Sequence, residues 1–126
     1  QATGFDNNRL NMLLALLERK LEIPLSGYDV FINITGGIKI TETAADLAVL
    51  AAIISSFRDR AISKETVFIG EVSLVGDVRE VYALDARLKE AKLQNISKAL
   101  LPKKPLEKTS MKVFVVDEVT KLLEWY

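Results

Sequence analysis

One stretch decides the fold of this 126-residue chain, residues 44–54: Ala44-Ala45-Asp46-Leu47-Ala48-Val49-Leu50-Ala51-Ala52-Ile53-Ile54. Its apolar residues fall on nearly every side of a helix, and a helix of that kind lies inside a domain rather than on its surface. Thr41 or Thr43 can cap its N-terminus, and the pattern runs to about Arg60. The sequence therefore predicts one central helix around which the other elements pack.

Two elements are predicted before this helix. Three- and four-residue spacing of leucines over residues 8–21 predicts an amphipathic helix with Asp6 or Asn7 as its N-cap. The leucines of its inner face are Leu10, Leu13, Leu14, Leu17 and Leu21. Pro24 and the Ser26-Gly27 pair predict a break in regular structure, and the β-branched and aromatic residues at 29–34 then predict a strand.

The remainder of the chain alternates short strands and helices. Strands are predicted at residues 66–69, 99–101 and 111–116 and on both sides of a turn at 75–77, with helices at 84–92 and from Asp117 to the end. This order lacks strict βαβ alternation, so we expect one compact α/β (α+β) domain over residues 1–126, with helices around a mixed sheet. Trp125 and Tyr126 can either fill the core or contact another subunit.

The composition excludes several chemistries. Hydrophobic residues make up 49% and charged residues 27% of the chain, as in ordinary globular proteins. The sequence has no cysteine and no histidine, so it offers no zinc ligands of these types, no disulfide, no thiol nucleophile and no imidazole base. The longest apolar run, residues 47–54, is too short to span a bilayer, and we expect a cytoplasmic protein without membrane contact.

Four stretches together carry a family signature. They are Gly-Phe-Asp-Asn-Asn-Arg-Leu at residues 4–10, Gly-Gly-Ile-Lys at 36–39, Ala-Ala-Asp-Leu-Ala at 44–48 and Gly-Glu-Val-Ser-Leu-Val-Gly-Asp-Val-Arg at 70–79. Each is weak alone, but in this order and spacing they resemble the C-terminal domain of the RadA (Sms) family of bacterial DNA-repair ATPases. The resemblance covers nearly the whole chain and implies a fold similar to the proteolytic domain of Lon.

The resemblance also implies that the Lon catalytic dyad is lost. Lon uses a serine nucleophile and a lysine base, and the matching positions here are Ala44 and Asp85. Because a hydroxyl needs a nearby base to become a nucleophile, we expect no proteolysis from this domain. One alternative is a Lon-like peptidase with a shifted dyad, in which Thr43 is the nucleophile and Lys39 or Lys89 the base.

The family resemblance implies partners and cofactors. It implies a homo-oligomer that closes into a hexameric ring, works on branched DNA during recombination and meets the recombinase RecA through the full-length protein. The chain has neither a phosphate-binding loop ending in Lys-Ser or Lys-Thr nor a four-cysteine zinc site. We therefore expect no cofactor or metal in this domain, and we expect ATP, Mg and Zn in other regions of a longer protein.

DNA contact by such a ring requires cations. The net charge is zero, so no whole-chain field attracts DNA. Arg9, Lys39 and Arg79 each stand beside a Gly or Asn turn, and they are the first candidates for contact with the phosphate backbone. A second basic patch comprises Arg87, Lys89, Lys92, Lys98, Lys103, Lys104 and Lys108. The alternatives are that these residues are solvated surface charges or partners of nearby carboxylates, and that the domain is a pure oligomerisation scaffold without DNA contact.

Overall fold

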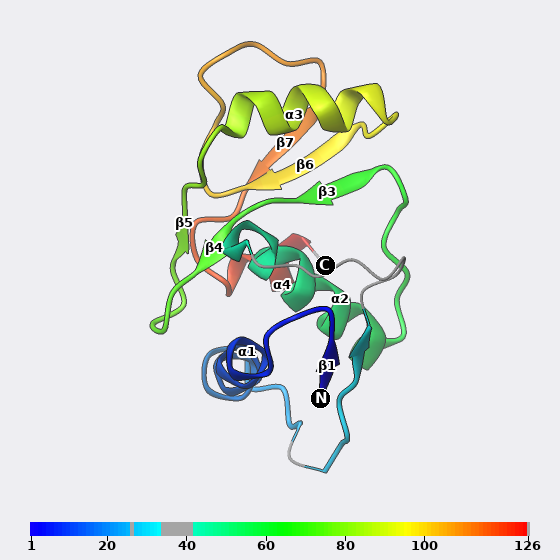
Figure 1. Ribbon diagram of the computed structural model, residues 1–126, viewed down its shortest axis with the longest axis vertical. Helices are drawn as coiled ribbons and strands as arrows, with labels where there is room; N and C mark the ends of the chain where they lie inside the picture. Colours follow the sequence, from blue (N-terminus) through cyan, green and yellow to red (C-terminus); the bar gives the residue numbers. More distant parts are fainter. Residues whose placement is uncertain (26, 34–41, 126) are drawn as a thin grey trace.

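A computed structural model of the chain describes residues 1–25, 27–33 and 42–125, and Figure 1 shows its elements. In chain order these are β1 (Ala2–Thr3), α1 (Asn7–Lys20), β2 (Ile32–Asn33), the 3₁₀ helix η2 (Thr43–Ala45), α2 (Asp46–Arg58), β3 (Thr66–Phe68), β4 (Glu71–Val72), β5 (Val78–Arg79), α3 (Leu84–Leu93), β6 (Lys98–Leu101), β7 (Lys112–Val115) and α4 (Lys121–Trp125). The predicted mixed α/β class is confirmed.

The largest sheet among the described residues is parallel and has the strand order β3-β6-β7. Its two faces carry separate apolar clusters, since successive side chains of a strand point to opposite sides. Leu100 packs with the residues of α2, whereas Ala99 and Leu101 pack with Leu88 of α3. In Figure 1, α3 lies above this sheet and α2 and α4 lie below it. Antiparallel pairing also occurs, but in the separate β4–β5 hairpin.

The predicted central helix is confirmed as α2. Leu47 and Leu50 are fully buried, as expected for a helix covered on several sides. Its N-terminus differs from the prediction, because Thr41 lies outside the described residues and Thr43 begins η2 without a side-chain cap. Backbone groups of Gly70 bind this end of the helix instead. The Gly70 carbonyl accepts the N–H of Leu47 at 3.2 Å, and the Gly70 N–H donates to the carbonyl of Ala44 at 3.0 Å.

The predicted first helix is confirmed as α1, and its N-cap is Asp6. The carboxylate of Asp6 accepts the backbone N–H of Arg9 at 3.2 Å. Leu16 is buried in place of Leu14, which the leucine spacing had put on the inner face and which is only half-buried. The buried leucines of α1 pack against α2 and form the centre of the larger apolar cluster.

The two ends of the chain differ from the predictions. The strand predicted at 29–34 is described only as β2, which pairs in parallel with β1, an element not predicted; residue 34 lies outside the described ranges. Asp117 does not cap the last helix, because α4 begins four residues later and the Asp117 carboxylate instead binds the Lys121 ammonium at 2.7 Å. Tyr126 and the side chain of Trp125 lie outside the described part of the chain. No helix in the described ranges is long and apolar enough to cross a membrane.

Candidate functional site

Five of the residues predicted to form a site, Arg9, Thr43, Ala44, Arg79 and Arg87, line two clefts, each of about 320 Å³, that share Glu71 as a common wall. The Ala44 cleft is lined by Glu42, Thr43, Ala44, Glu71, Glu80, Val81, Tyr82 and Arg87. The Arg9–Arg79 cleft is lined by Arg9, Met12, Glu71, Val72, Ser73, Leu74, Val75 and Arg79. The first cleft contains Ala44, the position predicted to match the Lon serine, and the second unites two of the three first DNA-contact candidates.

Asp85, the position predicted to match the Lon lysine, is not among the described residues that line the Ala44 cleft. Its carboxylate lies 3.5 Å from the backbone nitrogen of Glu107 in the loop after β6. Arg87, two residues further along α3, lines the cleft instead. Residues two apart on a helix point in nearly opposite directions, so Asp85 and Arg87 cannot face the same cleft.

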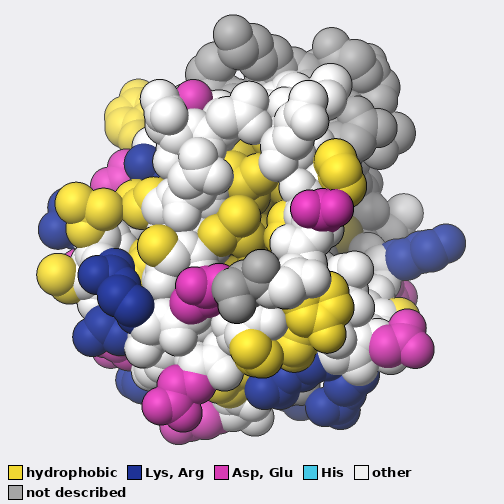
Figure 2. All heavy atoms as spheres, turned by 90° about the horizontal axis from the view of Figure 1, so that it is seen from below, with side chains coloured by type: hydrophobic (Ala, Val, Ile, Leu, Met, Phe, Trp, Pro, Cys, Tyr) yellow, Lys and Arg dark blue, Asp and Glu magenta, His cyan; other side chains and the backbone are white. Residues whose placement is uncertain are grey.

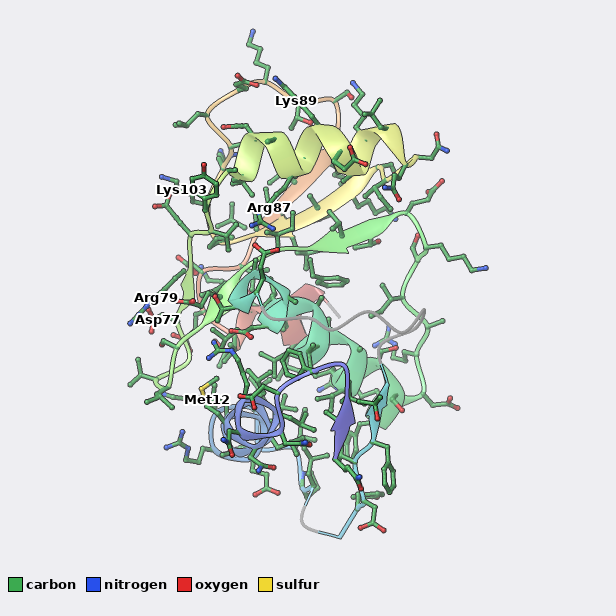
Figure 3. The ribbon with its side chains drawn as sticks, viewed as in Figure 1. Met12, Asp77, Arg79, Arg87, Lys89 and Lys103 are labelled. Atoms are coloured by element: carbon green, nitrogen blue, oxygen red, sulfur yellow. The ribbon has the colours of Figure 1, made fainter. Side chains whose placement is uncertain are left out.

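An ion pair joins the two walls of the Ala44 cleft. The Arg87 guanidinium binds the carboxylate of Glu42 and donates from Nε to the carbonyl of Tyr82 at 2.7 Å. Hydrogen bonding between the two side chains raises the pKa of Arg87 and lowers the pKa of Glu42. Figure 3 shows Arg87 between α3 and the start of α2. The sequence interpretation had placed Arg87 in the second basic patch, with pairing to a nearby carboxylate as the alternative, but had not identified Glu42 as its partner.

The described residues of the Ala44 cleft do not bring a lysine to Thr43. Thr43 lines the cleft, but Lys89 does not, and its ammonium lies 3.4 Å from the carboxylate of Glu107. In Figure 3, Lys89 lies on the outer side of α3. Lys39, the other predicted base, is outside the described residues. Arg87 cannot substitute for a lysine base, since a guanidinium does not lose its proton in proteins.

In the second cleft, the side chain of Arg9 forms an ion pair with a buried carboxylate. Its Nε donates to Oδ1 of Asp46 at 2.7 Å, and its Nη2 binds the other carboxylate oxygen and the carbonyl of Val72. Asp46 is 0% exposed and also accepts the N–H of Val72 at 3.0 Å. The hydrogen bond to Asp46 raises the pKa of Arg9, although burial acts in the opposite direction. The sequence interpretation had not paired these two residues.

Arg79 is the more accessible cation of the second cleft. Its side chain is 60% exposed, and its Nε lies 3.3 Å from the carboxylate of Asp77, as Figure 3 shows. The hydroxyl of Ser73 also donates to Asp77, and this hydrogen bond is the main reason that the pKa of Asp77 is lowered. Arg79 therefore reaches solvent at the mouth of the cleft, whereas the charge of Arg9 is already compensated inside it.

The second basic patch divides into paired and unpaired residues. Three of its members bind carboxylates: Arg87 binds Glu42, Lys89 binds Glu107 and Lys103 binds Glu80. Within the described ranges, no carboxylate lies within ion-pair distance of Lys92, Lys98, Lys104 or Lys108. In the same part of the chain, no group of three or more Asp or Glu side chains is arranged to hold a metal ion.

Comparison with known proteins assigns the chain to a class. Residues 6–105 match the family model described as subunit ChlI of Mg-chelatase, so the chain belongs to the domain family that this model describes. It is 64% identical over 124 residues to the DNA repair protein RadA of Campylobacter jejuni, 59% identical over 124 residues to that of Helicobacter pylori and 43% identical over 122 residues to that of Aquifex aeolicus.

Each of these alignments covers at least 96% of the chain, so the similarity extends over nearly its whole length. The chain belongs to the RadA family of DNA repair proteins. It spans about 28% of the length of these relatives and corresponds to one part of a longer protein. The family predicted from the four sequence stretches is thus confirmed.

Proposed function

We propose that this chain is a non-catalytic module through which a RadA-family DNA repair protein assembles into a ring and contacts the DNA backbone. In this role it supports the longer protein on branched recombination intermediates in the cytoplasm, in company with the recombinase RecA. The observation that carries the proposal is the identity to proteins named DNA repair protein RadA over 98% of the chain. The module needs no cofactor of its own; ATP, Mg and Zn belong to other regions of the longer protein.

The contents of the Ala44 cleft support a non-catalytic role. A serine-type peptidase needs a hydroxyl nucleophile and a base within hydrogen-bond reach of it. Ala44 has no hydroxyl, and the described residues that line the cleft include the Glu42–Arg87 ion pair but no lysine. An ion pair that joins η2 to α3 has a structural role in holding these two elements together.

The distribution of free cations supports contact with phosphates by Arg79 and the unpaired lysines rather than by Arg9. Two nitrogens of the Arg9 guanidinium already bind the two oxygens of the Asp46 carboxylate, so its positive charge is largely neutralised and attracts a phosphate only weakly. Arg79 is exposed and shares its charge with a single exposed carboxylate. Phosphate contacts of this kind position a protein on DNA without reading its sequence.

Binding of this chain to duplex DNA at several salt concentrations tests the proposal. We expect the affinity to fall as salt rises, because each phosphate contact releases counterions. Arg79→Glu should weaken binding and reduce the slope of log affinity against log salt by about one. Lys64→Glu makes the same change of charge at an exposed lysine outside both clefts and should leave the slope unchanged. Equal binding at low and high salt would contradict phosphate contact.

Two other outcomes would favour the alternative functions. An assembled chain that binds duplex DNA no better than its variant with Arg79, Lys39 and the unpaired lysines Lys92, Lys98, Lys104 and Lys108 all changed to glutamate acts as a scaffold only. Arg9 is a poor choice for this comparison, because its substitution also breaks the pair with Asp46. Peptide hydrolysis that disappears with Thr43→Ala, but persists with Thr43→Ser, would instead establish a peptidase with a shifted dyad.

A further inference from the structure

We propose that the turn between β4 and β5 is an apolar knob that inserts into a hollow on a second copy of the chain. The knob consists of Leu74 and Val75, and the hollow lies between residues 28–32 and the outer face of α2. This inference rests on the assembly part of the proposed function and names the surfaces that form the contact between subunits.

The knob is exposed although its residues are aliphatic. Leu74 is 67% exposed and Val75 is 65% exposed, and they are adjacent at the tip of the hairpin. Figure 1 shows this tip at the edge of the molecule, beyond α1. Exposure of two neighbouring aliphatic side chains to water is unfavourable, and burying them against a partner surface would lower the free energy.

The backbone holds the knob in one conformation. Within the turn, the Gly76 N–H donates to the Ser73 carbonyl at 3.1 Å, and the Ser73 N–H donates to the Asp77 carbonyl at 3.0 Å. Other elements brace it from outside: the Val119 N–H donates to the Gly76 carbonyl at 2.8 Å, and Arg19 of α1 donates to the Leu74 carbonyl at 3.3 Å. A rigid knob loses little conformational entropy on docking, and this favours binding.

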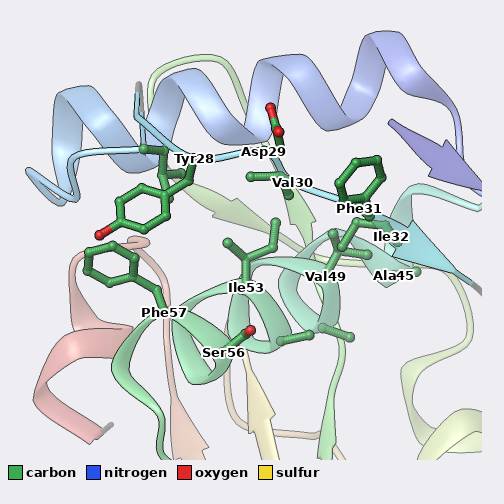
Figure 4. A pocket seen from close by; sticks show the side chains of 13 residues that line it. Tyr28, Asp29, Val30, Phe31, Ile32, Ala45, Val49, Ile53, Ser56 and Phe57 are labelled. Carbon is green, nitrogen blue, oxygen red and sulfur yellow. The ribbon is translucent and has the colours of Figure 1, made fainter.

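The hollow has a volume of about 870 Å³ and is lined mainly by apolar side chains. Its floor is the outer face of α2, and its walls include Tyr28, Phe31 and Phe57. Tyr28 and Phe31 are 62% and 73% exposed, and the rings of Tyr28 and Phe57 meet edge to face at 5.6 Å, as Figure 4 shows. Figure 2 looks at the molecule from below, and hydrophobic side chains gather in a hollow of that face.

The charges at the two surfaces are complementary. Arg19 and Arg79 flank the knob, whereas Asp29 is the charged residue that lines the hollow within the described ranges. Cations on one rim and an anion on the other favour one orientation of the two copies. The surroundings of the knob also include Glu71 and Asp77, and a rim of mixed charge is usual around the apolar centre of a protein interface.

The positions of the two surfaces make the contact heterologous. The β4–β5 turn and residues 28–32, which line the hollow, lie on different sides of α1 in Figure 1, so the knob of one copy cannot occupy the hollow of that same copy. When one copy gives its knob to the next and receives another in its own hollow, the same contact repeats around the assembly. Repeated contacts of this kind close a ring if the rotation fits and extend a filament if it does not.

Disulfide trapping tests the contact directly, because the chain has no cysteine of its own. We would mix chains carrying Val75→Cys with larger, tagged chains carrying Ser56→Cys, which lies in the hollow, and oxidise the mixture. The expected product is a crosslink between the two kinds of chain, since bridged cysteines need Cα atoms within about 7 Å. The matched control pairs Ser56→Cys with Leu106→Cys, an exposed apolar position in the loop before β7, and should give only background crosslinking.

Association of untagged chains, followed by solution mass against concentration, provides the second measurement. Leu74→Ser combined with Val75→Ser should weaken association about tenfold or more, as loss of an interface anchor does. Leu93→Ser combined with Leu106→Ser removes exposed aliphatic residues elsewhere and should leave association unchanged. Circular dichroism should show the same fold in all of these variants.

The outcomes separate this inference from the proposed function. If the chain associates but the knob variants associate equally well, or Val75→Cys crosslinks only with itself, the knob-and-hollow contact is wrong while ring assembly stands. If the chain is monomeric at every concentration, both the contact and the assembly part of the proposed function are wrong. Mixed crosslinks together with weakened association of the knob variants would support the contact.

Discussion

Arg9 of α1 donates two hydrogen bonds to the carboxylate of Asp46, which is the first residue of α2 and is completely buried. The pair is separated by 37 positions in the sequence, and it ties together the two helices that form the centre of the larger apolar cluster. The N–H of Val72 completes the coordination of the carboxylate, so β4 joins the same network. A buried charge of this kind needs such partners, because burial without them costs several kcal/mol.

We predict that Arg9→Met destabilises the fold by about 3 kcal/mol, because it leaves the Asp46 carboxylate buried without a counter-charge. Urea unfolding measures the change in the free energy of unfolding. The double variant Arg9→Met with Asp46→Asn should cost less than the sum of its single substitutions, since the two residues act as a unit. Arg58→Met, at an exposed arginine in the last turn of α2, should change stability by less than about 0.5 kcal/mol.

A second prediction concerns pH and Asp77. Its pKa lies below the ordinary 3.8, chiefly because the Ser73 hydroxyl donates to it, with a smaller contribution from Arg79. A depressed pKa in the folded state contributes stability above the unfolded pKa, and this contribution is lost as pH falls through the folded value. Ser73→Ala should therefore raise the Asp77 pKa, as followed by the carboxyl carbon in an NMR titration. Arg79→Gln should raise it less, and a larger effect from Arg79 would contradict the assignment.

A third prediction concerns the start of α3. Ala83 adopts φ 57° and ψ 45°, a left-handed conformation that costs a residue with a Cβ atom about 1–2 kcal/mol. Glycine avoids that strain but loses more backbone entropy on folding, so Ala83→Gly should stabilise the chain by up to about 1 kcal/mol. Ala86→Gly is the same substitution inside α3 and should destabilise by about 0.5–1 kcal/mol. Equal signs for the two variants in thermal unfolding would contradict this account.

The elements of the fold were predictable from the sequence where local patterns determine them. The leucine spacing predicted α1, and the apolar run at residues 44–54 predicted α2 as the central helix. The ends of elements were less predictable, because tertiary contacts determine them. The N-terminus of α2 is the example. Its backbone groups form hydrogen bonds with the backbone of Gly70, and no residue near the start of α2 in the sequence predicts this contact.

The candidate site was less predictable than the fold, because its residues are joined across long distances in the sequence. Arg9 stood beside an Asn turn and was interpreted as a DNA contact, but its orientation is set by Asp46. A signal for this pair existed, since a single carboxylate in an apolar central helix requires a partner. Likewise, a helical projection of α3 separates Arg87 from Asp85 and would have placed only one of them in the Ala44 cleft.

The last prediction tests the backbone contact between Gly70 and α2. A Cβ atom on Gly70 would lie 2.5 Å from Cγ1 of Val78, and this β-branched side chain cannot easily turn away. Gly70→Ala should therefore destabilise by about 1–3 kcal/mol through overpacking. Adding Val78→Ala removes the clashing methyl group, so the double variant should be less destabilised than the two single variants together. Gly27→Ala brings its new Cβ within 4 Å of no atom in the part of the chain that the structure describes, apart from its chain neighbours, and should change stability by less than about 0.5 kcal/mol in the same urea titration. If Gly70→Ala were as harmless as Gly27→Ala, β5 would not pack against Gly70 as closely as described, and the support that Gly70 gives to α2 and the Ala44 cleft would be looser as well.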